Sequence, residues 1–312
     1  MGMGRIVVDK SLSGHVTTSE GRPQLSVGRK AAFAVACVAA GFLPMSAGYI
    51  HSSVVRFVYG LLVTVVMLAL ALMARRRSAW RRYWQIPLAF FGMALFVLAD
   101  NYVPDFLRAN VLHVGTTSGN PIASTVSGTI IIQFNELLET VLAVLVVLWI
   151  SRSSLSSIYF RRGRFGRAYV IGIIGLVGFY VLTYRVLSHS RFIPVHGTLD
   201  VNRYLSLTPT LLVVAGMNAF LEELLFRGLL MSKLNIAFGP YLATFVQAVI
   251  FASWHVGITY TPVVLVFIVL DVFPLGLLAG YLTRSSGSIL PGWLFHIGVD
   301  IAIYLPFLSY VS

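Results

Sequence analysis

Long apolar runs separated by polar or proline-bearing breaks constrain the fold of this chain more than any other feature. The 312 residues are 57% hydrophobic and only 11% charged, and an α-helix needs about 20 apolar residues to cross a bilayer's hydrocarbon. Because the runs lack the alternation of a β-strand, only helices fit them. We therefore predict an all-α polytopic transmembrane helical bundle of about nine spans, at residues 31–50, 55–73, 84–100, 128–150, 168–185, 206–233, 240–257, 262–282 and 289–309.

The apolar runs divide the chain into three regions. Residues 1–30 hold no apolar run long enough for a cleavable signal, so we expect a basic, disordered cytoplasmic tail. Residues 31–200 hold about five helices to which we assign no role, and 201–312 hold about four helices that carry the candidate chemistry. Cys37 is the single cysteine, which leaves no partner for an intrachain disulfide and no cysteine metal cluster.

Basic residues mark one side of the membrane. They are concentrated in the tail, around Arg75 to Arg82 and around Arg152 to Arg167, whereas residues 101–127 are poor in them. The positive-inside rule places the N-terminus and the basic loops in the cytoplasm and 101–127 outside. The net charge of +12 predicts anionic lipid headgroups as partners of these loops. We expect no nucleic acid, because no nucleic-acid module is visible.

Two adjacent carboxylates interrupt the sixth apolar run. A charge near the bilayer centre costs at least about 2.5 kcal/mol, so intramembrane acids indicate function. Neighbours on a helix diverge by about 100°, so Glu222 and Glu223 are not expected to face one centre. Glu223 and Arg227 are four residues apart and suit an intrahelical ion pair. This division leaves Glu222 as the reactive group.

Two further spans each supply polar groups. The seventh contains His255, and the ninth contains His296 and Asp300 on one helix face. The rise of about 1.5 Å per residue puts Glu222, His255 and His296 within about two helical turns in depth. A single membrane histidine more often packs than catalyses, and a helix-end aspartate such as Asp300 can be merely solvated. The joint pattern favours a functional site.

The order of these motifs resembles a known family. Glu222-Glu223-x3-Arg227, Phe251-x3-His255 and His296-x3-Asp300, with Gly276-Leu-Leu-Ala-Gly280 and Ser288-Ile-Leu-Pro between the last two, resemble the CPBP family of intramembrane proteases. This family contains the eukaryotic CAAX prenyl endopeptidases and bacteriocin-processing and immunity proteins. The resemblance covers about residues 205–302.

The resemblance implies an intramembrane endopeptidase that hydrolyses a membrane-associated or exported peptide or protein. By the same resemblance, Glu222 is the general base that activates a water and His255 orients that water. His296 stabilises the oxyanion, with Asp300 beside it. An apolar environment makes a carboxylate a stronger base, and donors aimed at a developing oxyanion lower the barrier.

One position differs from the residue that is common in the family's prenyl-processing branch. Glu223 and Arg227 are expected to support the site structurally. In the prenyl-processing branch an asparagine commonly stands where this chain has Asp300, and an aspartate donates a hydrogen bond only when protonated. Asp300 is therefore either neutral or orients a charged His296. Bacterial relatives accept aspartate here, so the difference bears on the role of Asp300 more than on the activity. We expect an integral protein of a bacterial plasma membrane.

A metal ion is an alternative means of activating water. Glu222, His255 and His296 could together ligate zinc or another divalent metal. The chain lacks a His-Glu-x2-His pair that would hold two ligands on one helical turn. We therefore favour hydrolysis without a metal or other cofactor.

A non-enzymatic membrane protein is the alternative function. It would be a catalytically silent scaffold or immunity protein, or a proton-coupled transporter that uses intramembrane acids as a relay. The acids concerned are Glu136 and Glu139 in the fourth span and Asp271 in the eighth; the first two could instead line a water-filled entrance or pair with Arg185. A carrier more naturally shows two related halves, which we do not find.

Overall fold

Helices form all the regular structure in the part of the chain that the computed structural model describes, residues 26–110, 125–187, 195–255 and 266–311. Eight of them are long and apolar enough to cross a membrane, which confirms the predicted all-α transmembrane bundle. The expected tail falls mostly outside these residues. The α-helices are α1 (Val27–Ser46), α2 (Ser53–Arg76), α3 (Gln85–Asn110), α4 (Val126–Ser151), α5 (Arg167–Leu187), α6 (Val201–Glu222), α7 (Ser232–Trp254), α9 (Phe273–Ser286) and α10 (Leu290–Val311).

Shorter helical turns join or extend these helices. Two are 3-10 turns, at Ala47–Tyr49 and Leu155–Ile158. Two are π-helical, Glu223–Met231 between α6 and α7 and Ile268–Val272 directly before α9. The second ends just before Pro274, a residue that removes one backbone hydrogen bond from a continuing helix.

The count of eight agrees with nine predicted spans, because one continuous helical segment is long enough to cross twice. Val201–Trp254 has 54 residues and contains the predicted sixth and seventh spans. Its break lies at Gly239, whose φ of 74° and ψ of 176° are not helical, and Pro240 follows. The predicted break between the sixth span, 206–233, and the seventh, which begins at residue 240, is therefore confirmed.

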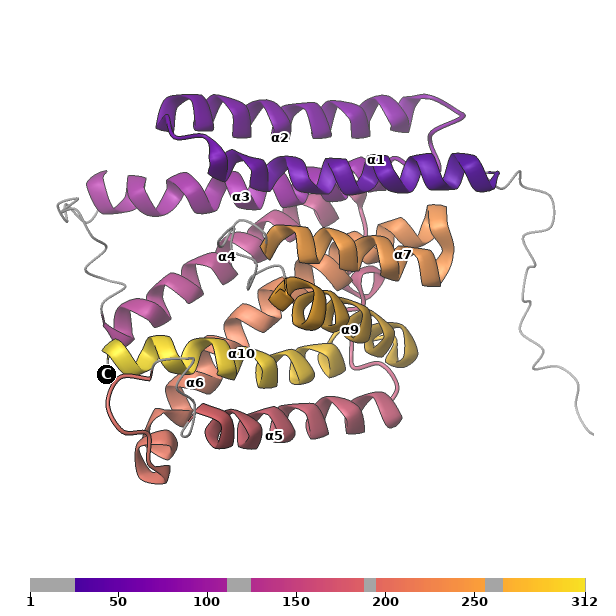
Figure 1. Cartoon of the computed structure of the whole chain (residues 1–312). Coiled ribbons are helices and arrows are strands. Elements are labelled where there is room, and N and C mark those ends of the chain that lie inside the picture. The colour runs from indigo at the N-terminus through magenta and orange to yellow at the C-terminus, as the bar shows by residue number, and fades with distance from the viewer. Residues whose placement is uncertain (1–25, 111–124, 188–194, 256–265, 312) are drawn as a thin grey trace, which may run out of the picture.

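The helices are arranged so that the middle of the molecule is enclosed by α6, α7, α9 and α10 (Figure 1). Helices α1, α2 and α3 run alongside one another at one edge, and α5 and α10 lie side by side at the opposite edge. Helices α4 and α6 cross between them, and α7 contacts both α1 and α9. The candidate residues of the last four predicted spans thus lie near the centre.

Glycines bring α5 against α10. A Cβ added to Gly298 would lie 2.8 Å from the Gly175 carbonyl oxygen, and one added to Gly175 would lie 2.2 Å from the Phe295 ring. Such close backbone approach is the usual role of small residues in membrane helices. Gly280 serves the same purpose in α9, because its Cβ would lie 2.7 Å from Thr244 of α7.

The loop between α4 and α5 is fastened to the turn before α10. Ile289 N donates to Tyr159 O at 3.2 Å, Arg164 N donates to Ser286 O at 2.7 Å, and Arg161 Nε donates to Gly287 O at 2.8 Å. We call this set of contacts the α10 latch. It fixes the start of the helix that carries His296.

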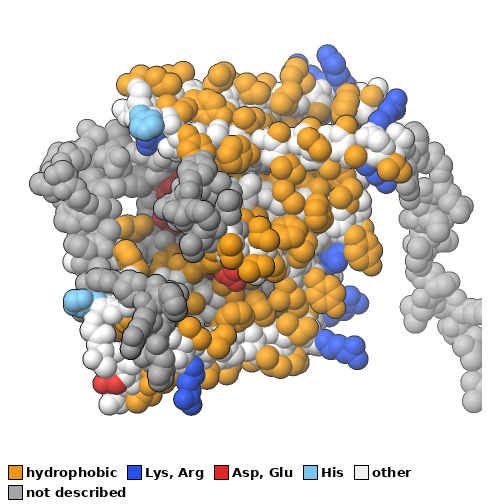
Figure 2. Space-filling view, viewed as in Figure 1, with side chains coloured by type: hydrophobic (Ala, Val, Ile, Leu, Met, Phe, Trp, Pro, Cys, Tyr) orange, Lys and Arg blue, Asp and Glu red, His pale blue; other side chains and the backbone are white. Residues whose placement is uncertain are grey.

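Charged side chains are sorted along the molecule. Lys and Arg gather mainly at the right-hand edge in Figure 2, with apolar side chains across the face between the ends. At this end α2 closes with Arg75 and Arg76, α5 begins with Arg167 and α9 closes with Arg284. The basic loops therefore share one side of the bundle, as the positive-inside argument requires. Which compartment they face stays a prediction, as does the division of the chain into three regions.

Candidate active site

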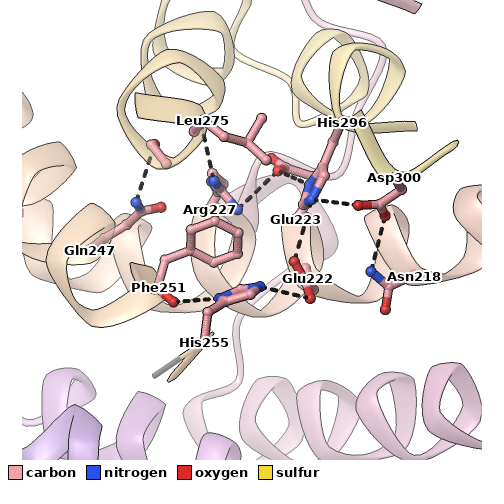
Figure 3. A network of polar contacts seen from close by, with 11 residues as sticks. Asn218, Glu222, Glu223, Arg227, Gln247, Phe251, His255, Leu275, His296 and Asp300 are labelled. Carbon is pink, nitrogen blue, oxygen red and sulfur yellow. Dashed lines mark hydrogen bonds and ion pairs between the residues drawn. The ribbon is translucent and has the colours of Figure 1, made fainter. Parts of the chain in front are cut away.

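The predicted site residues come together in one polar network (Figure 3). Helix α6 contributes Glu222, and the π-helical segment after it contributes Glu223 and Arg227. His255 follows the last residue of α7, and α10 contributes the remaining pair, His296 and Asp300. Three segments that are distant in sequence thus converge, as the depth argument predicted.

Glu222 and Glu223 both contact one imidazole, so the expectation that they face different centres is wrong. His296 Nε2 lies 3.4 Å from Glu222 Oε2, and His296 Nδ1 lies 3.0 Å from Glu223 Oε1. The expectation assumed ideal α-helical geometry, whereas the helix changes to π-helical at Glu223, a change that occurs frequently at functional sites. The two acids also approach different nitrogens of the same ring.

The expected ion pair between Glu223 and Arg227 is present and fully buried. Arg227 Nη1 lies 3.0 Å from Glu223 Oε1, and both side chains are 0% exposed. The guanidinium also lies 4.2 Å above the Phe251 ring and donates to the Leu275 carbonyl oxygen at 3.5 Å. Aromatic and carbonyl partners compensate part of the cost of burying this cation.

A glycine provides the space in which Glu223 lies. Gly292 stands one turn before His296 in α10, and a Cβ there would lie 2.9 Å from Glu223 Oε2. The same Cβ would lie 3.3 Å from the Ala279 carbonyl oxygen of α9. A side chain at this position would therefore compete with the carboxylate that holds His296.

Glu222 and His255 are the accessible members of the network. Glu222 Oε1 lies 3.9 Å from His255 Nε2, which is too long for a direct hydrogen bond. These side chains are 16% and 18% exposed, whereas those of His296 and Asp300 are each 2% exposed. A small molecule such as water can therefore reach the first pair more readily than the second.

The orientation of His255 fixes which of its nitrogens can accept a proton. His255 Nδ1 lies 2.9 Å from the Phe251 carbonyl oxygen. Because a carbonyl oxygen only accepts hydrogen bonds, Nδ1 carries the hydrogen. In the neutral ring, Nε2 then presents a lone pair toward Glu222 (Figure 3).

Asp300 is buried beside His296, so the alternative that it is a solvated helix-end residue is wrong. Its Oδ1 lies 3.5 Å from His296 Nε2. Its Oδ2 accepts a hydrogen bond from Asn218 Nδ2 at 3.0 Å. Asn218 was not among the predicted site residues. It stands one helical turn before Glu222 and therefore on the same face of α6.

Glu222 lies within 4 Å of both other residues considered as zinc ligands, His255 and His296. Glu222 uses different oxygens toward the two histidines, and His296 Nε2 also faces Asp300. Within the described ranges, no group of three or more His, Cys, Asp or Glu side chains is placed to hold a metal ion. The absence of a cofactor stays a prediction.

The acids of the fourth span have partners on their own helix. Gln133 Nε2 donates to Glu136 Oε2 at 2.9 Å, and Asn135 Nδ2 donates to Glu139 Oε1 at 2.8 Å. The lining of an entrance and the pairing with Arg185 both stay predictions.

Comparison with known families covers the region that holds this network. Residues 204–302 match the family model described as type II CAAX prenyl endopeptidase Rce1-like. No curated protein and no solved structure matched the chain. The matched segment begins in α6, ends in α10 and contains all six predicted site residues. The resemblance to the CPBP family of CAAX proteases is thus confirmed over residues 204–302. The eight apolar helices within the described residues make the chain an integral membrane protein.

Proposed function

We propose that this protein is an intramembrane endopeptidase in which Glu222 activates the attacking water. The observation that carries the proposal is the position of Glu222, whose two oxygens face Nε2 of His255 and Nε2 of His296 in a largely buried site. The family match to CAAX proteases supports the reaction class. The substrate we propose is a membrane-associated or exported peptide.

The water would be held between Glu222 and His255. The gap of 3.9 Å between Glu222 Oε1 and His255 Nε2 allows one water to bridge them. Both atoms accept, so the water donates one hydrogen to each and directs a lone pair at the substrate carbonyl carbon. Glu222 then takes a proton as the oxygen–carbon bond forms, which is general-base catalysis.

His296 would stabilise the negative charge on the substrate's carbonyl oxygen. Its Nδ1 faces the ion-paired carboxylate of Glu223, which accepts only, so Nδ1 carries a hydrogen. An N–H at Nε2 as well requires the imidazolium form, which the surrounding carboxylates favour electrostatically. Such a preformed donor lowers the barrier to the tetrahedral intermediate.

Asp300 and Asn218 would position this imidazolium. Asp300 presents one oxygen to His296 Nε2 and accepts from Asn218 with the other. This arrangement supports the second of the two expected roles, in which Asp300 orients a charged His296. Asn218 supplies, from α6, an amide beside the place where the prenyl-processing branch commonly has an asparagine.

The reaction closes when the intermediate collapses. The carbon–nitrogen bond breaks, and the proton taken by Glu222 passes to the leaving amine. The products are a carboxylic acid and an amine, which become a carboxylate and an ammonium ion by proton transfer, and Glu222 returns to its ionised form. Glu223 and Arg227 take no proton in this sequence and hold His296 in place.

The decisive experiment compares protein termini in membranes of cells that carry the native chain or Glu222→Gln at matched expression. Glu139→Gln is the matched control, because Glu139 is also a buried intramembrane carboxylate but lies on α4. We expect termini that are present with the native chain and with Glu139→Gln but absent with Glu222→Gln. Those termini would identify the substrate and the cleaved bond.

The opposite outcome would support the non-enzymatic alternatives. Identical termini in all three strains, with any growth phenotype retained by Glu222→Gln, would indicate a scaffold or immunity protein. A phenotype lost in Glu139→Gln as well as in Glu222→Gln, without altered termini, would indicate a proton-coupled carrier. We also propose that the membrane is a bacterial plasma membrane with the N-terminus in the cytoplasm.

A further inference from the structure

A cavity lies between the first three helices, and none of its lining residues belongs to the polar network. Its volume is about 470 Å³, within the range of small-molecule sites. Helix α1 lines it with Phe33, Cys37 and Ala40, and α2 lines it with Met67 and Ala74, among others. The first residues of α3 and the turn before it form the rest of the wall. Small side chains such as Cys37 and Ala40 leave the space between the helices unfilled.

The cavity is open to its surroundings along an apolar wall. Leu70, Met73 and Trp80 line it and are 43%, 49% and 50% exposed. Because α1 and α2 are predicted membrane spans, the medium outside this opening is the bilayer. A peptide in the cavity would bury backbone N–H and C=O groups against a wall with few polar partners, which is costly. A hydrocarbon chain has no such groups.

One charged residue lines the cavity, and it stands at the basic end of the molecule. Arg77 follows the last residue of α2, and Trp80 and Tyr83 beside it are typical of the headgroup level of a membrane. Arg75 lies 4.9 Å from the ring centroid of Trp84, and Arg82 lies 5.7 Å from that of Tyr83. Arg77 is thus the arginine placed to meet a headgroup above the apolar cavity.

The surrounding charge selects the sign of that headgroup. Residues 27–99 contain eight Lys and Arg residues and no Asp or Glu. A phosphate is a preferred partner of an arginine fork, and each basic residue near the surface strengthens binding of an anionic lipid about fivefold.

We propose that this cavity is a binding site for an anionic phospholipid of the leaflet at the basic end, with one acyl chain between α1 and α2 and the phosphate on Arg77. The site is independent of the proposed peptidase activity. Because α1 contacts α7, where Trp254 Nε1 donates to Gly41 O at 2.8 Å, the lipid would also support the helix that ends beside His255.

The test uses the full chain in detergent and measures retained lipid by native mass spectrometry. The probes are dioleoylphosphatidylglycerol and dioleoylphosphatidylcholine at equal concentration. We expect at least fivefold higher retention of the phosphatidylglycerol, lost in Arg77→Gln but kept in the matched Arg76→Gln. Filling the cavity with Ala74→Phe should also abolish it, whereas Leu72→Phe on the same helix, outside the cavity wall, should not.

Equal retention of both lipids, equal effects of Arg77→Gln and Arg76→Gln, or retention of uncharged farnesol as strong as that of phosphatidylglycerol would each overturn the proposal.

Discussion

Gly292→Ala tests whether the contact between Glu223 and His296 depends on space left by a glycine. The new methyl would lie 2.9 Å from Glu223 Oε2, and ordinary contacts begin at 3.4 Å, so one group must move by at least 0.5 Å. The methyl would also lie 3.3 Å from the Ala279 carbonyl oxygen, which is itself closer than an ordinary contact. Glu223 is also confined, by Arg227 and His296 at 3.0 Å each.

The expected cost follows from this confinement. Overpacking of this kind typically destabilises a protein by about 1–3 kcal/mol, and misplacing a catalytic group by about 1 Å can slow a reaction about 100-fold. We expect Gly292→Ala to lower the free energy of unfolding within that range and to reduce Glu222-dependent cleavage by at least tenfold. The tenfold minimum is smaller than 100-fold because the minimum displacement expected here is smaller than 1 Å.

Unfolding by sodium dodecyl sulfate, followed by circular dichroism, measures the stability, and the rate of product appearance measures cleavage. Gly178→Ala in α5 is the matched control, because its Cβ would meet nothing within 4 Å. The reasoning would be refuted by a Gly292→Ala protein that is as stable and as active as Gly178→Ala.

Four further changes have definite expected results. Arg227→Met leaves the buried Glu223 carboxylate without its cation, so the free energy of unfolding should fall by about 3–5 kcal/mol in the same detergent titration; a fall below about 1 kcal/mol contradicts the buried pair. His255→Ala should slow cleavage about 10²–10⁴-fold with little change in stability, and a rate within threefold of native would remove it from the mechanism. Asn218→Ala should reduce kcat by a larger factor than it changes KM, because Asp300 loses its hydrogen-bond donor. A change in KM alone would argue against a positioning role for Asn218. Treatment with 1,10-phenanthroline should leave the cleavage rate unchanged, and a loss that zinc restores would show that a metal takes part.

The sequence predicted the number of spans and the residues of the site better than it predicted their geometry. Hydrophobic runs determine helices in a membrane because every backbone polar group must be satisfied internally, and Gly239-Pro240 marks the one break inside a continuous helical segment. The change to π-helix at Glu223 has no comparable signal, because it depends on how the segment packs against α7 and α10. That change is why both Glu222 and Glu223 reach His296.

Two supporting residues escaped sequence reasoning for different reasons. Asn218 had a usable signal, since its spacing from Glu222 places both on one helix face, but its partner Asp300 is 82 residues away. Gly292 had none, because the space it leaves is defined only by Glu223 and Ala279 from other segments. Contacts between distant segments become visible only once the helices are placed.

The α10 latch sets how far below the membrane surface the groups of the candidate active site lie. His296 stands seven residues beyond Ile289, which corresponds to about 10 Å along the helix. Because the latch ties that starting point to backbone atoms of the loop after α4, the depth of the catalytic groups does not adjust to bilayer thickness. An extended substrate advances about 3.3 Å per residue, so the proposed reaction would cleave a bond about three residues inside the substrate's apolar segment, and adding polar residues outside the membrane would not move that bond.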